Sequence, residues 1–289
     1  MGTSQSSSGS PSGVPLVPPW VPDPVQPDGQ DVDGQDAQDG QDGNSENQSA
    51  PSFQPTLPIS PPALAPAGRF GPARTSLGRF ARSGSADDMR RGVGHYFGKG
   101  LGGGGSATQR FGGATRTAGS LYGVLSSAAA GQTTEPGSPF DPALLSGRSA
   151  DEVMDAVVEI VRPVDGTQDA EASRNAIRTA LSELLDRFPD ADLLNLSEDQ
   201  RLFVIERYLA LDVYNRIRLD VGKAIQDKAP SVVAALSRMR QIRDYVRETI
   251  ASHFRALFTS GQSLNARRIA QMGTQALHEA FEVFEEYVR

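Results

Sequence analysis

Residues 197–228, SEDQRLFVIERYLALDVYNRIRLDVGKAIQDK, predict one long helix. Ser197 and Gln200 have the spacing of a capping box, which marks the start of this helix. Its apolar residues recur at helical spacing over a wide face, and they are Leu202, Phe203, Ile205, Leu209, Val213, Ile217, Val221 and Ile225. A helix that is apolar over so much of its surface is packed on several sides. We therefore expect it to lie at the centre of the fold.

Four further helices are predicted around it. The first begins at the capping box Ser149-x-x-Glu152 and ends before Pro163, and the second covers about residues 168–187. The other two follow Pro230 and Asn265, and an apolar stripe that includes Val232, Leu236 and Met239 predicts the inward face of the fourth helix. Short connections favour antiparallel neighbours, so we expect an all-α fold with a five-helix domain over residues 140–289.

Before this domain lies a basic, glycine-rich stretch, residues 85–130, which contains SADDMRRGVGHYFGKGLGGGGSATQRFGGATRTAGSLYGVL. Residues 67–120 carry nine basic side chains against two acidic ones, a net charge of +7. Ser85, followed by Asp87 and Asp88, is a helix start of the kind that the helix dipole favours. The composition predicts a hinge with two short helices, the second over about residues 108–126.

The remaining N-terminal part, residues 1–84, is predicted to be a disordered arm rich in Pro, Gly and Ser. The first 66 residues contain no Lys or Arg and eight acidic side chains. Three copies of the sequence DGQD lie within residues 28–42, but the position of their glycines does not fit a calcium-binding EF-hand loop. Such dense charge and low hydrophobicity cannot offset the entropy of ordering, so we expect the arm to act as a long, mobile tether.

The composition also excludes several classes of site. The chain of 289 residues has no cysteine, and therefore neither a disulfide nor a thiolate metal site. It has no apolar run long enough to cross a membrane and no secretory signal at its N-terminus, which predicts a cytoplasmic protein. Gly100-x-Gly102-x-x-Gly105 matches a dinucleotide-binding pattern without the required preceding strand. His95, His253 and His278 lack metal-spaced partners, so we expect no metal, no cofactor and no enzymatic activity.

The basic stretch holds the residues that we expect to contact a binding partner. They are Arg90, Arg91, Tyr96, Lys99, Arg110, Phe111 and Arg116. Arginine and aromatic residues interleaved with glycine suit single-stranded nucleic acid, because arginines follow phosphates and aromatic rings stack on bases. The alternative is that these arginines meet a partner protein or the protein's own acidic side chains. Glu279, Glu282, Glu285 and Glu286 are expected to face either the basic stretch or a partner.

Position 2 of the sequence is a glycine. A small second residue permits removal of Met1, which leaves the α-amine of Gly2 free at the tip of the arm. The start also fits the short myristoylation pattern M-G-x-x-x-[ST], although that pattern often matches by chance. An unmodified terminus remains open as an alternative.

Three segments together resemble the QatB family of the bacterial Qat anti-phage defence system. They are the start MGTSQSSSGSPSGVPLVPPW, the centre RRGVGHYFGKGLGG…ATQRFGG…RTAGSLYGVL and the helical C-terminal part. The resemblance implies a non-catalytic component whose partners are a P-loop ATPase, a QueC-like enzyme and a TatD-like nuclease. It also implies that the QueC-like enzyme attaches a 7-deazaguanine group to Gly2, with Thr3 and Ser4 as the recognition context.

Overall fold

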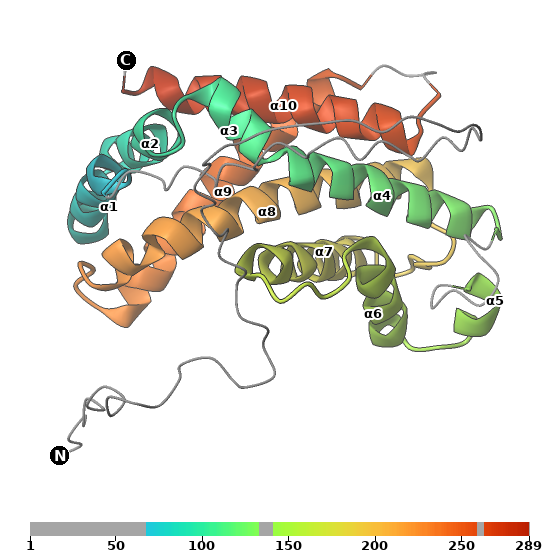
Figure 1. The fold of residues 1–289 in the computed structure, drawn as a ribbon. Coiled ribbons are helices and arrows are strands. Elements are labelled where there is room, and N and C mark those ends of the chain that lie inside the picture. Colours follow the sequence, from blue (N-terminus) through green and yellow to red (C-terminus); the bar gives the residue numbers. More distant parts are fainter. Residues whose placement is uncertain (1–67, 133–140, 259–262, 289) are drawn as a thin grey trace, which may run out of the picture. The chain divides into compact units, whose positions relative to one another are not determined.

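The structure is a computed structural model that describes residues 68–132, 141–258 and 263–288 (Figure 1). These residues form ten α-helices and one π-helical turn, and they contain no β-strand. The predicted all-α fold class is therefore confirmed. The helices are α1 (Gly71–Ser83), α2 (Ala86–His95), the π-helical turn η1 (Tyr96–Gly100), α3 (Gly104–Arg110), α4 (Gly112–Ala129), α5 (Pro142–Leu145), α6 (Ala150–Val161), α7 (Gln168–Arg187), α8 (Glu198–Gln226), α9 (Val232–Ala256) and α10 (Ala266–Glu286).

The five helices predicted for the C-terminal part are α6 to α10. Ser149 and Ser197 form the predicted capping boxes with Glu152 and Gln200, so α6 and α8 begin where the sequence indicated. The side chain of Asn265 caps α10 by accepting a hydrogen bond from the main-chain N–H of Arg268. The predicted end of the fourth helix at residue 261 lies outside the described residues. The short helix α5 was not predicted.

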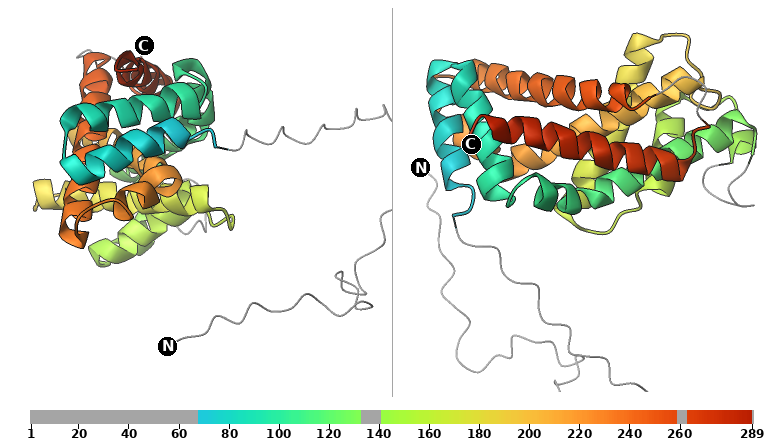
Figure 2. Two further views of the ribbon diagram at one scale, coloured as in Figure 1. Left: turned by 90° about the vertical axis from the view of Figure 1, so that its left-hand side faces the viewer. Right: turned by 90° about the horizontal axis from the view of Figure 1, so that it is seen from above.

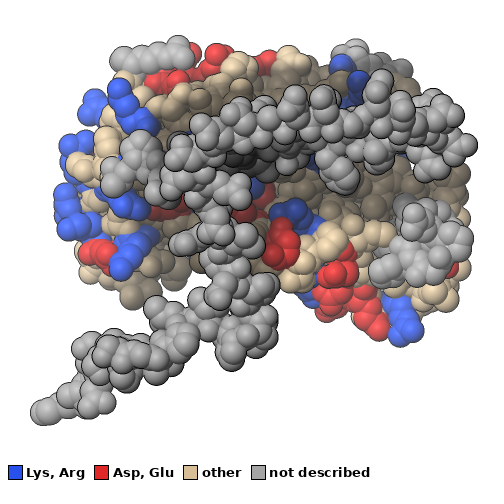
Figure 3. All heavy atoms as spheres, in the orientation of Figure 1, with Lys and Arg blue, Asp and Glu red and all other residues tan. Residues whose placement is uncertain are grey.

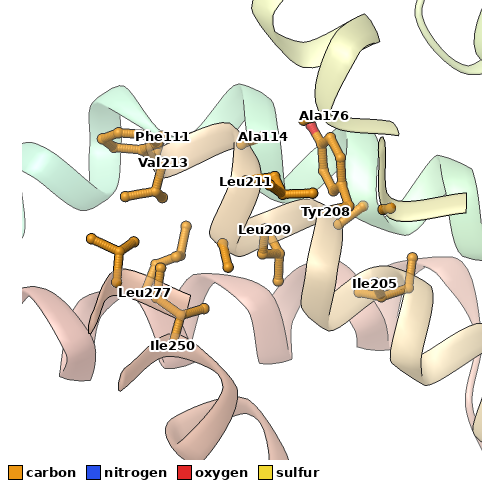
Figure 4. Packing of buried hydrophobic residues seen from close by; sticks show 14 of the residues in the cluster. Phe111, Ala114, Ala176, Ile205, Tyr208, Leu209, Leu211, Val213, Ile250 and Leu277 are labelled. Atoms are coloured by element: carbon orange, nitrogen blue, oxygen red, sulfur yellow. The ribbon is translucent and has the colours of Figure 1, made fainter. Parts of the chain in front are cut away.

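The long helix α8 lies at the centre of the described fold, as predicted. It contacts α7 and α9 along its length and also packs against α1 and α4. Tyr208, Leu209 and Val213 of α8 are fully buried, and Figure 4 shows them together with residues of the neighbouring helices. The wide apolar face of α8 is therefore explained by helices on several of its sides.

One boundary predicted from the sequence is wrong. The arm was expected to extend to residue 84, but Gly71–Ser83 form helix α1, which packs against α2 and α8. Leu77 and Phe80 of α1 are fully buried. The basic side chains between these apolar residues obscured the helical pattern, because α1 exposes its charges on one face and buries the other.

The basic stretch also differs from its predicted form as a hinge with two short helices. It folds into α2, η1, α3 and the 18-residue helix α4, and α4 and α10 lie side by side (Figure 1). Ser85 caps α2 as expected, by accepting a hydrogen bond from the main-chain N–H of Asp88. Residues 62–289 form one compact unit, so the stretch is part of the same folded body as the C-terminal helices (Figure 2).

The first turns of α9 depart from the predicted inward face. Val232 and Leu236 were expected in the core but have exposed fractions of 77% and 56%, whereas Met239 is buried as predicted. The helical period is continuous through all three positions, but in the first turns of α9 only Ala235 is buried, and the regular burial of the apolar stripe begins at Met239. None of the described helices has the length and apolar character needed to cross a membrane.

A candidate partner-binding groove

The aromatic residues of the basic stretch lie in the core. Phe97 stacks on Phe281 and Phe284 of α10, with ring centroids 4.3 and 5.2 Å apart. Phe111 packs against Phe281 at 5.3 Å, and Figure 4 shows it near Val213 of α8. These contacts explain how a segment so rich in glycine can be folded, because aromatic side chains from two distant parts of the chain supply its core.

This burial corrects the prediction for Tyr96 and Phe111. Both were expected to contact a partner, yet each has an exposed fraction of only 1%. The hydroxyl of Tyr96 donates a hydrogen bond to Oδ2 of Asp220 at 2.8 Å, and burial, together with Asp220, raises the Tyr96 pKa well above its ordinary value. Tyr96 therefore keeps its proton and joins η1 to α8, and neither ring has a free face for a nucleic acid base.

Two neighbouring hollows open on the surface beside these aromatic residues. The larger, about 660 Å³, lies between α1 and the C-terminal half of α8, and the smaller, about 290 Å³, is bordered by η1, α3, α7 and α8. Leu219 and Asp220 line both, so the hollows form one continuous surface that we call the cationic groove. Its charged lining residues are Arg69, Arg74, Arg82, Arg110, Asp169, Arg216, Asp220, Lys223, Asp227 and Lys228.

Positive charge dominates this groove, with seven cationic side chains against three carboxylates and hence a formal net charge of +4. The whole chain, by contrast, has a net charge of −7. Figure 3 shows Lys and Arg side chains gathered at the left-hand end of the molecule, where Figure 1 places α1 and α2. The first 66 residues account for −8 of the chain's charge, so residues 67–289 have a net charge of only +1, and the groove belongs to the positively charged end of this part.

Most of the seven cations have no carboxylate partner within the described part of the chain. Arg216 is the exception, since it pairs with both Asp212 and Asp169 at 3.2 Å. The Arg74 guanidinium donates a hydrogen bond to the main-chain oxygen of Asp220 at 2.9 Å, and that of Arg69 lies 4.6 Å from the centre of the Phe70 ring. The four cations that form no ion pair, side-chain hydrogen bond or aromatic-ring contact among the described residues are Arg82, Arg110, Lys223 and Lys228.

Other residues predicted as contacts lie outside the groove. Arg90 is half-buried, pairs with Asp87 at 3.6 Å and lies over the ring of Tyr287. Arg91, Lys99 and Arg116 are exposed. The structure therefore brings only Tyr96, Arg110 and Phe111 of the predicted set together, and among them only Arg110 is accessible to a partner.

Three cations of the groove were not singled out from the sequence. Arg216, Lys223 and Lys228 lie in or just after the C-terminal half of α8, where the helix dipole favours positive charge. The helix dipole alone accounts for a cation at each of these positions, so the sequence offered no reason to expect that they line a shared surface. Only the packing of distant elements places Lys223 and Lys228 in one hollow with Arg74 and Arg82, and Arg216 in the other with Arg69 and Arg110.

A third hollow, separate from the cationic groove and about 770 Å³ in volume, lies between α7, α8 and α9. Phe188, Phe203 and Phe254 line it, and the buried carboxylate of Glu206 accepts two hydrogen bonds from Arg255, at 2.6 and 2.7 Å. The polar centre of this hollow is satisfied internally, and none of the predicted contact residues lines it. It is therefore the weaker candidate for a binding site.

The acidic residues of α10 lie partly against the glycine-rich stretch, which is one of the two predicted alternatives. A Cβ atom placed on Gly104 would lie 3.5 Å from Cγ of Glu282 and 3.6 Å from Oε1 of Glu285. Glu279 instead lies 3.1 Å from Nδ1 of His253. Within the described residues, no group of three or more His, Asp or Glu side chains could hold a metal ion.

The structural observations define a class of protein, an all-helical protein with an open, positively charged groove. A family model described as Qat anti-phage system associated protein QatB matches residues 102–284, which is more than half of the chain. The chain therefore belongs to the QatB family, as its resemblance predicted, and has a role in the Qat anti-phage defence system. No match was found among curated proteins or among solved structures.

Proposed function

We propose that this protein is an adaptor of the Qat system and also a protein substrate within it. In this proposal the helical body docks partner proteins, and Gly2 receives a 7-deazaguanine group from the QueC-like enzyme of the system. The observation that carries the docking role is the unneutralised charge of the cationic groove. Six of its seven cations have no carboxylate partner among the described residues, and four of these, Arg82, Arg110, Lys223 and Lys228, make no other side-chain interaction there that would occupy them.

The role of Gly2 rests on the family and on the chemistry of a free N-terminus. Gly2, Thr3 and Ser4 lie outside the described residues. An α-amine has an ordinary pKa of about 7.7–8.0, so a useful fraction is unprotonated and nucleophilic near neutral pH. The nitrogen of Gly2 would attack an activated carbon of the 7-deazaguanine group and form the new bond, while the bond from that carbon to its leaving group breaks and the nitrogen loses a proton. Glycine suits this role because it places no side chain beside the attacking nitrogen.

Mass spectrometry of the intact protein and of its N-terminal peptide tests the modification. The protein is expressed alone and together with the P-loop ATPase, the QueC-like enzyme and the TatD-like nuclease. We expect an adduct on Gly2 only in the second sample. An unmodified glycine in both samples would reject the modification.

Substitution separates the modification from its biological role. We expect Gly2→Ala to lose both the adduct and protection against phage, whereas Gly9→Ala, a matched change farther along the arm, should retain both. Full protection by a Gly2→Ala protein with a plain N-terminus would show that the modification is dispensable.

Nucleic acid binding is the alternative function, and the burial of the aromatic side chains limits the ways in which it could occur. The sequence contains an Arg-Phe pair at residues 69–70, 79–80 and 110–111. The phenylalanines of these pairs, Phe70, Phe80 and Phe111, are all buried, so base stacking by these residues is not available. What favours the alternative is the run of cations in the groove, which could contact phosphates. This form of binding predicts an affinity for a single-stranded oligonucleotide that falls steeply as salt rises, and no binding at low salt would reject it.

A further inference from the structure

Exposed aliphatic side chains lie near the cationic groove. Leu219 lines both of its hollows and has an exposed fraction of 47%. Just beyond Lys228, in the first two turns of α9, Val232, Val233 and Leu236 are exposed as well. These four residues are more than half of the seven large hydrophobic residues that are exposed in the described part of the chain. Leu219 therefore adds aliphatic surface inside the groove, and the three residues of α9 follow its last cation, Lys228, along the chain, although Leu236 lines a separate hollow beside Arg218.

We propose that the cationic groove binds an acidic segment of a partner protein of the Qat system, and that this segment carries aliphatic side chains beside its carboxylates. The proposal rests on the adaptor function proposed above and names the chemistry of the partner. Carboxylates of the segment would pair with Arg82, Arg110, Lys223 and Lys228. Its aliphatic side chains would cover Leu219 and the start of α9.

The carboxylates of the groove favour a peptide over a nucleic acid. Asp220 and Asp227 lie among the cations, and a phosphate backbone would have to pass close to both. A peptide carries main-chain N–H groups that can donate to these carboxylates while its acidic side chains reach the cations. A DNA backbone has no such donors, and its phosphates would be repelled by the two aspartates.

The exposed aliphatic residues also favour a peptide over a nucleic acid. Single-stranded nucleic acid is bound through aromatic rings that stack on bases, and the two aromatic residues of the groove are buried. Leu219 offers instead a surface that is stabilised by contact with aliphatic side chains. Residues 67–289 carry 28 basic and 27 acidic side chains, so their charges nearly cancel and the excess of positive charge is concentrated in the groove, which would fix the place where an acidic partner docks.

Charge reversal in the groove tests the electrostatic part. Arg82→Glu with Lys223→Glu reverses two exposed cations that form no ion pair among the described residues. The full-length variant is co-expressed with the ATPase, the QueC-like enzyme and the TatD-like nuclease, and the amount of each partner that co-purifies is measured. We expect at least one partner to fall by about tenfold. Arg267→Glu with Arg268→Glu, the same change of charge in the exposed first turn of α10, should have no effect.

Removal of the aliphatic contact provides an independent test without a change of charge. We expect Leu219→Ser to reduce co-purification of the same partner, whereas Leu144→Ser, at another exposed leucine, should not. Circular dichroism of each variant checks that the fold is retained.

Three results would overturn the proposal. One is full co-purification of every partner with the charge-reversed variant. Another is a wild-type protein that co-purifies with none of them. The third is a variant that keeps its partners but loses binding to a 20-nucleotide single strand, which would assign the groove to nucleic acid. The Gly2 adduct is followed in the same samples, so failure of the groove and failure of the modification are told apart.

Discussion

At the scale of single residues, Asp212 shows how the groove is supported from within. Its side chain is completely buried in α8 and pairs with Arg216, which in turn reaches Asp169 of α7. Burial raises the pKa of Asp212 above its ordinary value of 3.8, and the charge of Arg216 opposes this only in part. Asp212 therefore holds Arg216, a cation of the groove, in place. The ionised form of Asp212 nevertheless destabilises the fold, because its charge is buried.

This balance predicts an effect of pH on the variant Asp212→Asn. As pH rises above 3.8, the unfolded chain releases the proton of Asp212 before the folded protein does, so ionisation destabilises the wild type. Asparagine does not ionise. We therefore expect the stability of the variant relative to wild type to rise between pH 4 and pH 7, that is, its free energy of unfolding minus that of the wild type should increase. Urea unfolding at both pH values measures it, and a constant difference would contradict the expectation.

A glycine in α4 illustrates a second effect at this scale. A Cβ atom on Gly119 would lie 2.4 Å from the main-chain oxygen of Ala266, so α4 and α10 can approach closely only because no side chain is present. We expect Gly119→Ala to lower the free energy of unfolding by about 1–3 kcal/mol.

The matched control is Gly123→Ala, one turn later on the same helix. Its Cβ would lie 3.5 Å from Cβ of Ala266, an ordinary contact, so the change should be neutral or stabilise the helix by up to about 1 kcal/mol. Urea unfolding of both variants compares them. Equal effects would show that the close approach does not limit this position.

At the scale of secondary-structure elements, α8 and η1 determine how the groove is built. Helix α8 supplies Arg216, Leu219, Asp220 and Lys223, and its start is fixed by the Ser197–Gln200 capping box. In η1, the adjacent residues Tyr96 and Phe97 are both buried, one against Asp220 and the other against α10. The π-helical turn therefore joins the groove to the core.

The capping box of α8 makes a prediction for this element. The hydroxyl of Ser197 accepts a hydrogen bond from the main-chain N–H of Gln200 at 3.3 Å, and the Gln200 side chain accepts one from the N–H of Ser197 at 2.9 Å. Ser197→Ala leaves a helix-terminal donor without its partner, so we expect a loss of about 1 kcal/mol in thermal or urea unfolding. Ser197→Asp supplies another acceptor and should retain most of the stability. Equal losses in both variants would contradict a capping role.

At the scale of the whole molecule, residues 62–289 form one compact unit that begins before α1. Helix α1 contributes Leu77, Phe80 and other buried side chains to the core and forms one wall of the groove. The earlier boundary at residue 84 would remove this wall. The position of the boundary therefore decides both stability and the binding surface.

Two fragments test the boundary. We expect residues 62–289 to unfold cooperatively at the melting temperature of the full chain. Residues 86–289 lack α1, and because the loss of a single buried Leu or Phe side chain costs about 2–5 kcal/mol, we expect this fragment to be unfolded or aggregated. Circular dichroism during heating compares them, and equal melting temperatures would show that α1 is peripheral.

The sequence by itself determined the five helices of the C-terminal part, α6 to α10, and where several of them begin. Capping boxes and apolar periods depend on residues within a few positions of each other, so Ser149, Ser197 and Asn265 could be placed without a structure. Membership of the QatB family could likewise be inferred from short segments, and the family match confirms it.

Only the tertiary structure decided which aromatic residues are buried and where the groove lies. Phe97 packs against α10, and Arg82 lines the same hollow as Lys223, in each case across more than 100 residues of intervening chain. A local pattern shows that a side chain is apolar or charged, but not which distant helix covers it. Val232 was expected in the core but is exposed, and Tyr96 was expected on the surface but is buried. Burial depends on which helices pack over a side chain, and the whole fold sets that packing.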